Sequence, residues 1–138
     1  MAKFNFRSKS KAIGRYAEYK LMKILYEKGY FVARAPASGS KSSKYPTVDV
    51  IAMKRGTILL FEVKRRKEKE AITIDKEQIE KLKEAQQLSG GSAYIAVYLD
   101  STKSWYIFTL DQIKLKQNSY LLSVYEFDKA KSLDLLTD

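Results

Sequence analysis

The chain contains neither cysteine nor histidine, and these two absences exclude several kinds of chemistry. Disulfide bonds, zinc sites built on cysteine or histidine, and thiol nucleophiles are excluded. Hydrolases that need an imidazole as their base are excluded for the same reason. Any metal ion must therefore be held by carboxylates, carbonyl oxygens and water, a ligand set that suits hard cations such as Mg²⁺ or Mn²⁺.

Long apolar runs are also missing. No run approaches the ~20 residues that a membrane-spanning helix needs, and no apolar signal core follows the first residues. We therefore expect no membrane span and a cytoplasmic location. The 138 residues are 45% hydrophobic and 30% charged, which is an ordinary globular composition and predicts a single domain over residues 1–138.

The net charge of +10 is unevenly distributed, because the excess of Lys and Arg lies in the first 70 residues. A basic excess confined to one half favours a surface that faces a polyanion, most often a nucleic acid. A charge-rich surface that only solvates the fold explains the same composition. Charge alone leaves both interpretations open.

Hydrophobic periodicity predicts an α/β domain. Ile13, Ala17, Leu21 and Leu25 recur at helical spacing and predict a helix over about 10–28, which Gly29 ends. A second helix is predicted at 75–88, and strands at 30–34, 48–53, 57–63, 93–99 and 105–110. This order predicts a mixed five-stranded sheet flanked by helices.

Three further segments are predicted from their composition. Residues 35–46 are rich in serine and contain both prolines of the chain, so they form a loop. Residues 64–70 are almost all charged, so the strand before them ends at 63 and emerges into solvent. The tail is predicted to form an edge strand at 120–125 and a short helix at 127–136.

Two acidic residues interrupt apolar strand patterns, where an unpaired carboxylate is costly. Asp49 lies within Val48–Ile51, and Glu62 lies within Leu59–Val63. If the turn at 54–56 forms a hairpin, Asp49 is opposite or diagonal to Glu62, within the distance of cross-strand neighbours. Lys64 projects from the same strand face as Glu62.

Two such carboxylates repel each other unless a proton or a cation lies between them. A divalent cation would relieve the repulsion and also serve phosphodiester hydrolysis, by activating water and stabilising the leaving oxygen. Lys64 would then contact the attacking water or the phosphate. An ordinary cross-strand salt bridge between Lys64 and either acid, at an exposed edge of the sheet, is the structural alternative.

Residues 46–64 resemble the PD-(D/E)xK nuclease signature, with Asp49 three residues after Pro46 rather than next to it, and with Glu62-Val63-Lys64 following. Residues 10–91 further resemble the archaeal Holliday junction resolvase family in five features in the same order. These are Gly14-Arg15-Tyr16-Ala17-Glu18, Lys28-Gly29-Tyr30, the loop Arg34-Ala35-Pro36-Ala37-Ser38-Gly39-Ser40, the Glu-x-Lys tripeptide followed by a helix with Gln78, and Ser89-Gly90-Gly91.

The resemblance implies a restriction-endonuclease-like fold and a homodimer that resolves four-way DNA junctions by Mg²⁺-dependent phosphodiester hydrolysis, with Mn²⁺ as a substitute. It implies Glu18, Asp49 and Glu62 as metal ligands and Lys64 as the catalytic lysine. It also implies a role for Ser38 in strand cleavage and for Gln78 in supporting the site. Without the resemblance, Glu18 would be read as a solvent-exposed glutamate paired with a neighbouring lysine.

Basic and hydroxyl side chains near these positions are expected to contact DNA phosphates rather than bases, although about half of the basic side chains are expected only to solvate the fold. The aromatic residues of 94–108 are expected to form either a subunit interface or core. The candidate DNA contacts are Lys9, Lys11, Arg15, Arg34, Ser40, Lys41, Lys44, Arg65 and Arg66.

Two other functions remain open at this stage. Another PD-(D/E)xK endonuclease, of restriction or repair type, would share the acidic site but prefer a different DNA structure. A non-catalytic DNA-binding protein would keep the basic surface, but a cluster of acids would weaken its binding.

Overall fold

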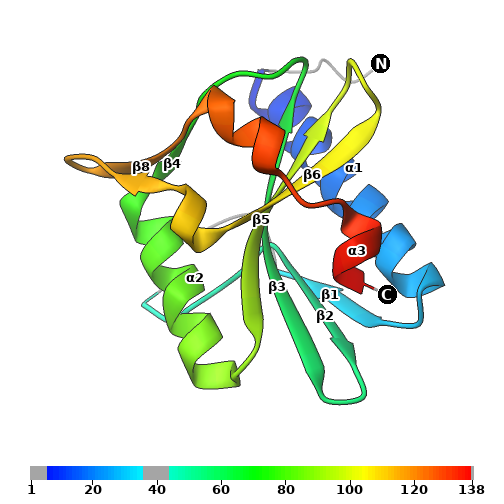
Figure 1. Cartoon of the computed structure of the whole chain (residues 1–138). Helices are drawn as coiled ribbons and strands as arrows, with labels where there is room; N and C mark the ends of the chain where they lie inside the picture. Colours follow the sequence, from blue (N-terminus) through cyan, green and yellow to red (C-terminus); the bar gives the residue numbers. More distant parts are fainter. Residues whose placement is uncertain (1–5, 36–43, 138) are drawn as a thin grey trace.

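Five strands form the central sheet of the computed structural model, which describes residues 6–35 and 44–137. They are β1 (Phe31–Arg34), β2 (Val50–Lys54), β3 (Thr57–Arg66), β5 (Ser92–Leu99) and β6 (Ser104–Thr109). They lie in the order β1-β2-β3-β5-β6, with β3 and β5 parallel and the other neighbours antiparallel (Figure 1). The predicted mixed five-stranded sheet is confirmed.

Two helices cover opposite faces of this sheet: α1 (Phe6–Glu27) and α2 (Lys76–Ser89). Because strand side chains alternate, the odd-numbered residues of β3 face α1 and the even-numbered ones face α2. Thus Phe61 shares a cluster with Leu21 of α1, whereas Leu60 shares one with Leu82 of α2. Glu62 therefore lies on the α2 side of the sheet.

β3 is longer than predicted, since it continues to Arg66 instead of ending at residue 63. Its last residues, Lys64–Arg66, pair with Val97–Leu99 of β5. The Nε of Arg65 donates to Oδ1 of Asp100 at 2.9 Å. The prediction was wrong because a run of charge was taken as a sign of solvent, whereas here the charged side chains stay half-buried or form ion pairs along a paired strand.

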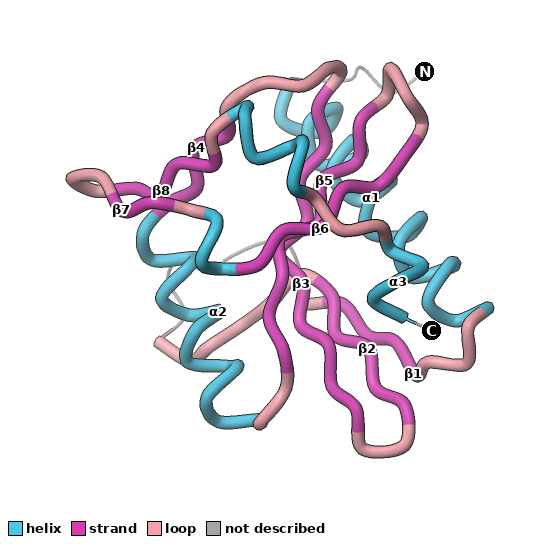
Figure 2. The backbone as a smooth tube through the Cα atoms, viewed as in Figure 1, coloured by secondary structure: helices cyan, strands magenta, loops and turns pink. Residues whose placement is uncertain are grey.

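A second sheet, absent from the sequence predictions, contains β4 (Ile72–Asp75), β7 (Lys114–Leu115) and β8 (Ser119–Leu122) in the order β4-β8-β7. Figure 2 shows the β7–β8 hairpin projecting from one side of the molecule. The strand predicted at 120–125 is present as β8, but it ends at Leu122, and the predicted edge position is wrong because β8 is the middle strand of this separate sheet. Ile72 and Ile74 of β4 and Leu122 of β8 are buried, which joins the small sheet to the core near α2.

The C-terminal region also differs from the single predicted helix at 127–136. It forms two 3-10 helices, η2 (Leu110–Gln112) and η3 (Val124–Lys129), followed by α3 (Leu133–Thr137). Between η3 and α3, Lys131 exchanges two backbone hydrogen bonds with Ile107 and so covers part of the outer edge of β6. Within the described ranges, no helix has the length and apolar character needed to span a bilayer.

The aromatic residues of β5 and β6 belong mainly to the core. Phe108 is fully buried and Tyr98 nearly so, while Tyr94, Trp105 and Tyr106 are half-buried and pack against the core clusters. Of the two interpretations left open by the sequence, the structure therefore favours packing over a subunit interface for these side chains.

Two glycines shape the connection from α2 to β5. Gly90 ends α2 in the left-handed conformation, with φ of 74°, which suits glycine at a helix C-terminus. Gly91 meets a spatial constraint instead, because a Cβ atom there would lie 2.7 Å from the backbone oxygen of Ile58. The close approach of Gly91 to β3 allows β5 to start alongside β3.

Replacing Gly91 with Ala should therefore destabilise the protein, because the added methyl group meets the Ile58 backbone rather than a movable side-chain end. We expect a loss of about 1–3 kcal/mol in the free energy of unfolding, measured by chemical denaturation. Ser92→Ala, at the exposed next position, is the matched control and should change it by less than about 0.5 kcal/mol. Equal effects of the two substitutions would contradict the packing argument.

Candidate active site

The hairpin of β2 and β3 brings Asp49 and Glu62 together. Val50 pairs with Phe61, so extending the register by one residue places Asp49 directly opposite Glu62. The backbone N–H of Val63 donates to Oδ2 of Asp49 at 2.8 Å, which holds the Asp49 side chain against β3. Glu62 is only 4% exposed, and it is the only buried acidic residue within the described part of the chain. The predicted cross-strand proximity is confirmed.

Burial and mutual repulsion raise the pKa values of both carboxyls. For Glu62, burial raises the pKa most and the neighbouring Asp49 raises it further, to about 8, against the opposing effect of Lys64. For Asp49, burial also raises the pKa, although the Val63 N–H and Lys64 oppose this. A hydrogen bond between the two side chains favours the protonated form of Glu62. Near neutral pH Glu62 is therefore the member of the pair that holds a proton.

Lys64 provides the nearest cation to this pair. Its Nζ lies 3.6 Å from Oε1 of Glu62, and its side chain is 20% exposed. The contact is long for a hydrogen-bonded ion pair and leaves the ammonium partly open to solvent. The alternative interpretation was an ordinary salt bridge at an exposed edge of the sheet. Glu62, the acidic partner of Lys64, instead lies on β3, which is the middle strand of the sheet.

Glu18 approaches the pair from α1 but is engaged elsewhere. The Nε of Arg34 donates to its Oε1 at 2.9 Å, and both side chains are mostly buried. Burial raises the pKa of Glu18, the hydrogen bond from Arg34 lowers it, and the charge of Asp49 raises it again. Within 6–35 and 44–137, no three acidic side chains are arranged so that they could together hold a metal ion. The structure thus brings together two of the three predicted carboxylates and places Glu18 beside Asp49.

The remaining predicted residues are distributed unevenly around this centre. Gln78 lies half-buried in the first turn of α2, and the structure records no hydrogen bond from it to the carboxylates. Arg15 and Lys44 are exposed, whereas Arg65 and Arg66 form ion pairs with Asp100 and Glu70. Ser38, Ser40 and Lys41 lie outside the described residues, as do the side chains of Lys9 and Lys11.

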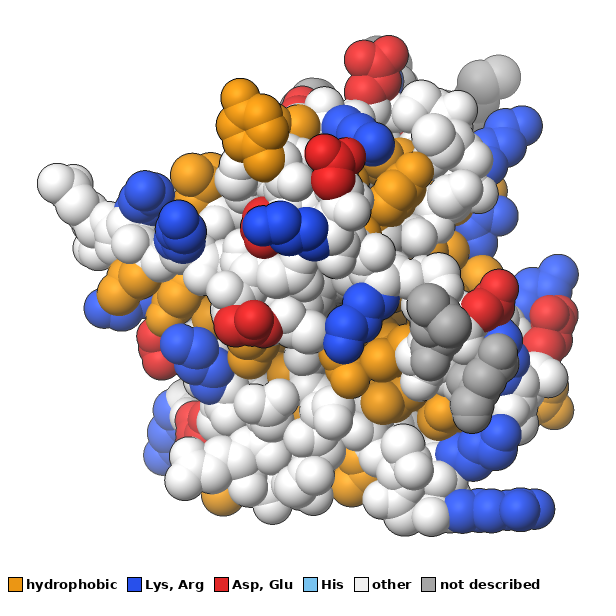
Figure 3. Space-filling model, in the orientation of Figure 1, with side chains coloured by type: hydrophobic (Ala, Val, Ile, Leu, Met, Phe, Trp, Pro, Cys, Tyr) orange, Lys and Arg blue, Asp and Glu red, His pale blue; other side chains and the backbone are white. Residues whose placement is uncertain are grey.

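Overall charge does not locate a binding surface by itself. On the face seen in Figure 3, Lys and Arg side chains are interspersed with acidic and apolar ones and form no continuous basic area. The residues near Asp49 and Glu62 are a better guide to the position of a ligand. One of these residues is Tyr19, whose ring lies against Arg34. This residue was not identified from the sequence. The only feature of the sequence that could have pointed to Tyr19 is its place next to Glu18 in a predicted helix.

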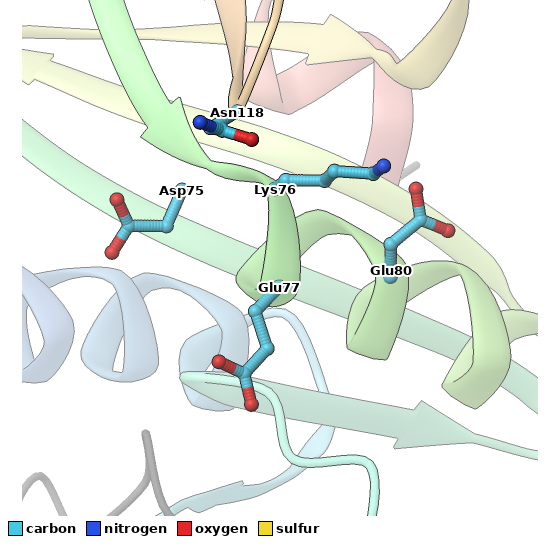
Figure 4. Close-up of a pocket in the computed structure, with 5 residues that line it drawn as sticks. All are labelled: Asp75, Lys76, Glu77, Glu80 and Asn118. Carbon is cyan, nitrogen blue, oxygen red and sulfur yellow. The ribbon is translucent and has the colours of Figure 1, made fainter.

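A surface hollow of ≈ 500 Å³ lies elsewhere, at the start of α2. It is lined by Asp75, Lys76, Glu77, Glu80 and Asn118, and Figure 4 shows the carboxylates of Glu77 and Glu80 pointing in different directions. None of these residues belongs to the carboxylate pair or touches Lys64. The hollow is therefore separate from the candidate active site.

Comparison with known proteins identifies a matching family. A model of the archaeal Holliday junction resolvase (Hjc) family matches residues 9–137. The chain is 43% identical over 90 residues to the crossover junction endodeoxyribonuclease Hjc of Sulfurisphaera tokodaii, which covers 65% of this chain and 62% of that protein. It is 42% identical over 69 residues to a crossover junction endodeoxyribonuclease of Sulfolobus islandicus rod-shaped virus 1, covering 50% of this chain and 54% of the viral protein. The chain thus matches about three-fifths of the length of its curated cellular relative.

The fold has a counterpart among solved structures. The Hjc Holliday junction resolvase of Archaeoglobus fulgidus superimposes with a TM-score of 0.74 and 22% identity, covering 87% of this chain and 99% of that one. At this level of identity the comparison supports the fold. The nuclease fold predicted from the resemblance is confirmed.

The raised pKa of Glu62 predicts how the stability of the protein depends on pH in the absence of divalent cations. Because the pKa of Glu62 is raised on folding from 4.5 to about 8, its protonated form stabilises the folded state below pH 4.5, and this contribution is lost as pH rises through 8. Glu62→Gln keeps the side chain neutral at every pH. The variant should therefore gain stability relative to the wild type as pH rises from about 5 to about 8, by on the order of 2–4 kcal/mol.

Thermal and urea unfolding in EDTA across this pH range measures the difference. Glu68→Gln, an exposed glutamate in the connection after β3, is the control and should show a nearly constant difference. Parallel stability profiles for Glu62→Gln and the wild type would mean that Glu62 is already ionised in the folded protein.

Proposed function

The chain belongs to the archaeal Holliday junction resolvase family, and we propose that it is a structure-specific endonuclease that hydrolyses phosphodiester bonds near the branch point of four-way DNA junctions. The observation that carries this proposal is the pair formed by the half-buried Asp49 and the buried Glu62, with Lys64 beside it. A structural role alone does not account for two neighbouring carboxyls, one of them buried on the middle strand of the sheet, because desolvation and mutual repulsion oppose folding.

Members of this nuclease family depend on a divalent metal ion, and the donors present fit a hard cation. The side chains that could bind a cation here are carboxylates, and a cation would replace the proton that the raised pKa of Glu62 keeps on that carboxyl. We propose Mg²⁺, with Mn²⁺ as a substitute, held by Asp49 and Glu62. Glu18 would complete the carboxylate set if its hydrogen bond to Arg34 is exchanged. The ion would supply activation of water and stabilisation of charge on the phosphate.

The remaining roles in cleavage would fall to side chains and backbone groups of the protein. Lys64, partly exposed and only loosely paired to Glu62, would hydrogen-bond the attacking water or the scissile phosphate and offset its charge. The Val63 N–H would keep Asp49 in position through the reaction. Ser38 and Gln78 would support cleavage, and Arg15, Arg34 and Lys44 would contact phosphates.

We further propose that the active form is a homodimer that acts where the DNA is, in the cytoplasm of an archaeal cell or of a host cell if the protein is virus-encoded. A four-way junction has two-fold symmetry, so two equivalent sites related by the same symmetry can nick opposing strands. One chain contributes one pair of carboxylates, which suits a single incision per subunit.

Cleavage of a labelled four-way junction, compared with a linear duplex of the same sequence, tests this function. With Mg²⁺ we expect paired nicks near the branch point of the junction and little cutting of the duplex. Glu62→Gln should lower the rate by about 10²–10³-fold or more, because the cation loses a charged ligand, while Glu68→Gln should not change it. EDTA should abolish cutting by every variant.

Two outcomes would change the assignment. Equal cutting of junction and duplex would retain a metal-dependent nuclease but contradict the preference for branched DNA. Tight binding of the junction without cutting, in Mg²⁺ and in Mn²⁺, would contradict catalysis and favour a DNA-binding protein.

A further inference from the structure

Arg34 contacts two consecutive residues of α1. Its Nε donates to Glu18 at 2.9 Å, and its guanidinium carbon lies 5.1 Å from the centre of the Tyr19 ring. Tyr19 is 54% exposed. With a cation against one face and more than half of the side chain in solvent, the rest of the ring is accessible to a ligand.

A second observation points to a missing partner at the same place. The Nη2 atom of Arg34 is buried and has no hydrogen-bond acceptor, although guanidinium groups normally satisfy their donors. Its neighbours Glu18 and Tyr19 do not supply that acceptor. An incoming oxygen, from a phosphate or a base carbonyl, would satisfy this donor once a shift of the Arg34 side chain exposes it.

The position of Tyr19 relates it to the candidate active site. Tyr19 follows Glu18 directly, and Arg34 also lowers the pKa of Asp49 by its charge, which places the guanidinium close to the carboxylate pair. An exposed ring backed by arginine is the arrangement that stacks on unpaired nucleobases, because every base has a π-face and the arginine offsets the adjacent phosphate. A paired base inside a duplex cannot reach such a ring.

We infer that the Tyr19 ring, backed by Arg34, is a stacking site for one unpaired nucleobase next to the bond that is cut. The inference deepens the proposed function. It rests on that function, because the function identifies the bound DNA as branched. It adds a way to distinguish branched from linear DNA, since only distorted DNA presents an unstacked base beside the carboxylates.

Two other tyrosines of α1 define the controls. Tyr26 lies two turns further along the same helix and is 71% exposed, but no cation lies over its ring among the described residues. Tyr16 lies under both Arg65, at 4.6 Å, and Lys20, at 5.3 Å. Arg34 and Arg65 both pair with a carboxylate, but of the two only Arg34 has a buried nitrogen without a hydrogen-bond partner, so we interpret the Tyr16 contacts as a packing cluster rather than a ligand site.

The test uses the full chain in EDTA, so that binding is measured without cutting. The probe is a duplex with one bulged 2-aminopurine, compared with the fully paired duplex of the same sequence. Stacking on an aromatic ring quenches the fluorescence of the unpaired 2-aminopurine. Wild type, Tyr19→Phe, Tyr19→Leu and Tyr26→Leu are compared at several salt concentrations, after thermal unfolding has shown that each variant is folded.

The wild type, Tyr19→Phe and Tyr26→Leu should quench the probe and bind the bulged duplex more tightly than the paired one. Tyr19→Leu should lose the quenching and about tenfold in affinity for the bulged duplex, with little change for the paired duplex and an unchanged salt dependence. Because junction cleavage is assayed separately, loss of the proposed function would not be confused with loss of the stacking site.

Either of two results would overturn the inference. If Tyr19→Leu weakens both duplexes equally and makes the salt dependence shallower, Tyr19 only holds Arg34 for phosphate contact. If Tyr19→Leu and Tyr26→Leu behave alike in quenching and affinity, the ring contributes nothing specific to base binding.

Discussion

The repulsion between two carboxyls, the buried Glu62 and the half-buried Asp49, is the constraint on which the rest of the site depends. Asp49 comes directly before β2, next to the pair Val50 and Phe61, so the hairpin brings it close to Glu62, and the Val63 N–H donates to Asp49 and holds its side chain there. Without a cation the molecule relieves the repulsion by keeping a proton on Glu62, whose pKa rises to about 8. A divalent cation can replace that proton, so the same constraint that opposes folding prepares the site for a metal ion.

The surrounding fold keeps this arrangement rigid on one side and adjustable on the other. β3 pairs with β2 as far as Phe61 and with β5 along its C-terminal part, so Glu62 and Lys64 are held by backbone pairing with Ile95 and Val97 of β5. Glu18 and Arg34 instead meet through side chains at the end of β1 and on α1. The second group can exchange partners without breaking a strand pairing, which makes it the part of the site suited to respond to bound DNA.

The central sheet and the carboxylate pair could be predicted from the sequence, because apolar alternation marks the strands and Asp49 and Glu62 interrupt it. The length of β3 and the small sheet could not. Arg65 is stabilised in β3 by Asp100, which is 35 residues away in the chain, and β4 pairs with β8 across more than 40 residues, so no local pattern reveals either. The hydrogen bond from Arg34 to Glu18 was hidden for the same reason: each residue was recognised, but their pairing depends on how α1 crosses β1.

The claim that a cation displaces a proton from Glu62 is tested most directly by calorimetric titration of the metal-free protein with Mn²⁺ near pH 7. The titration is repeated in buffers that differ in ionisation enthalpy. Because Glu62 holds a proton that the cation must displace, binding should release close to one proton per site. Glu62→Gln should bind the cation weakly and release almost none. Tight binding by the wild type without proton release would contradict the account, since it would mean that the two carboxylates are already ionised before the cation arrives.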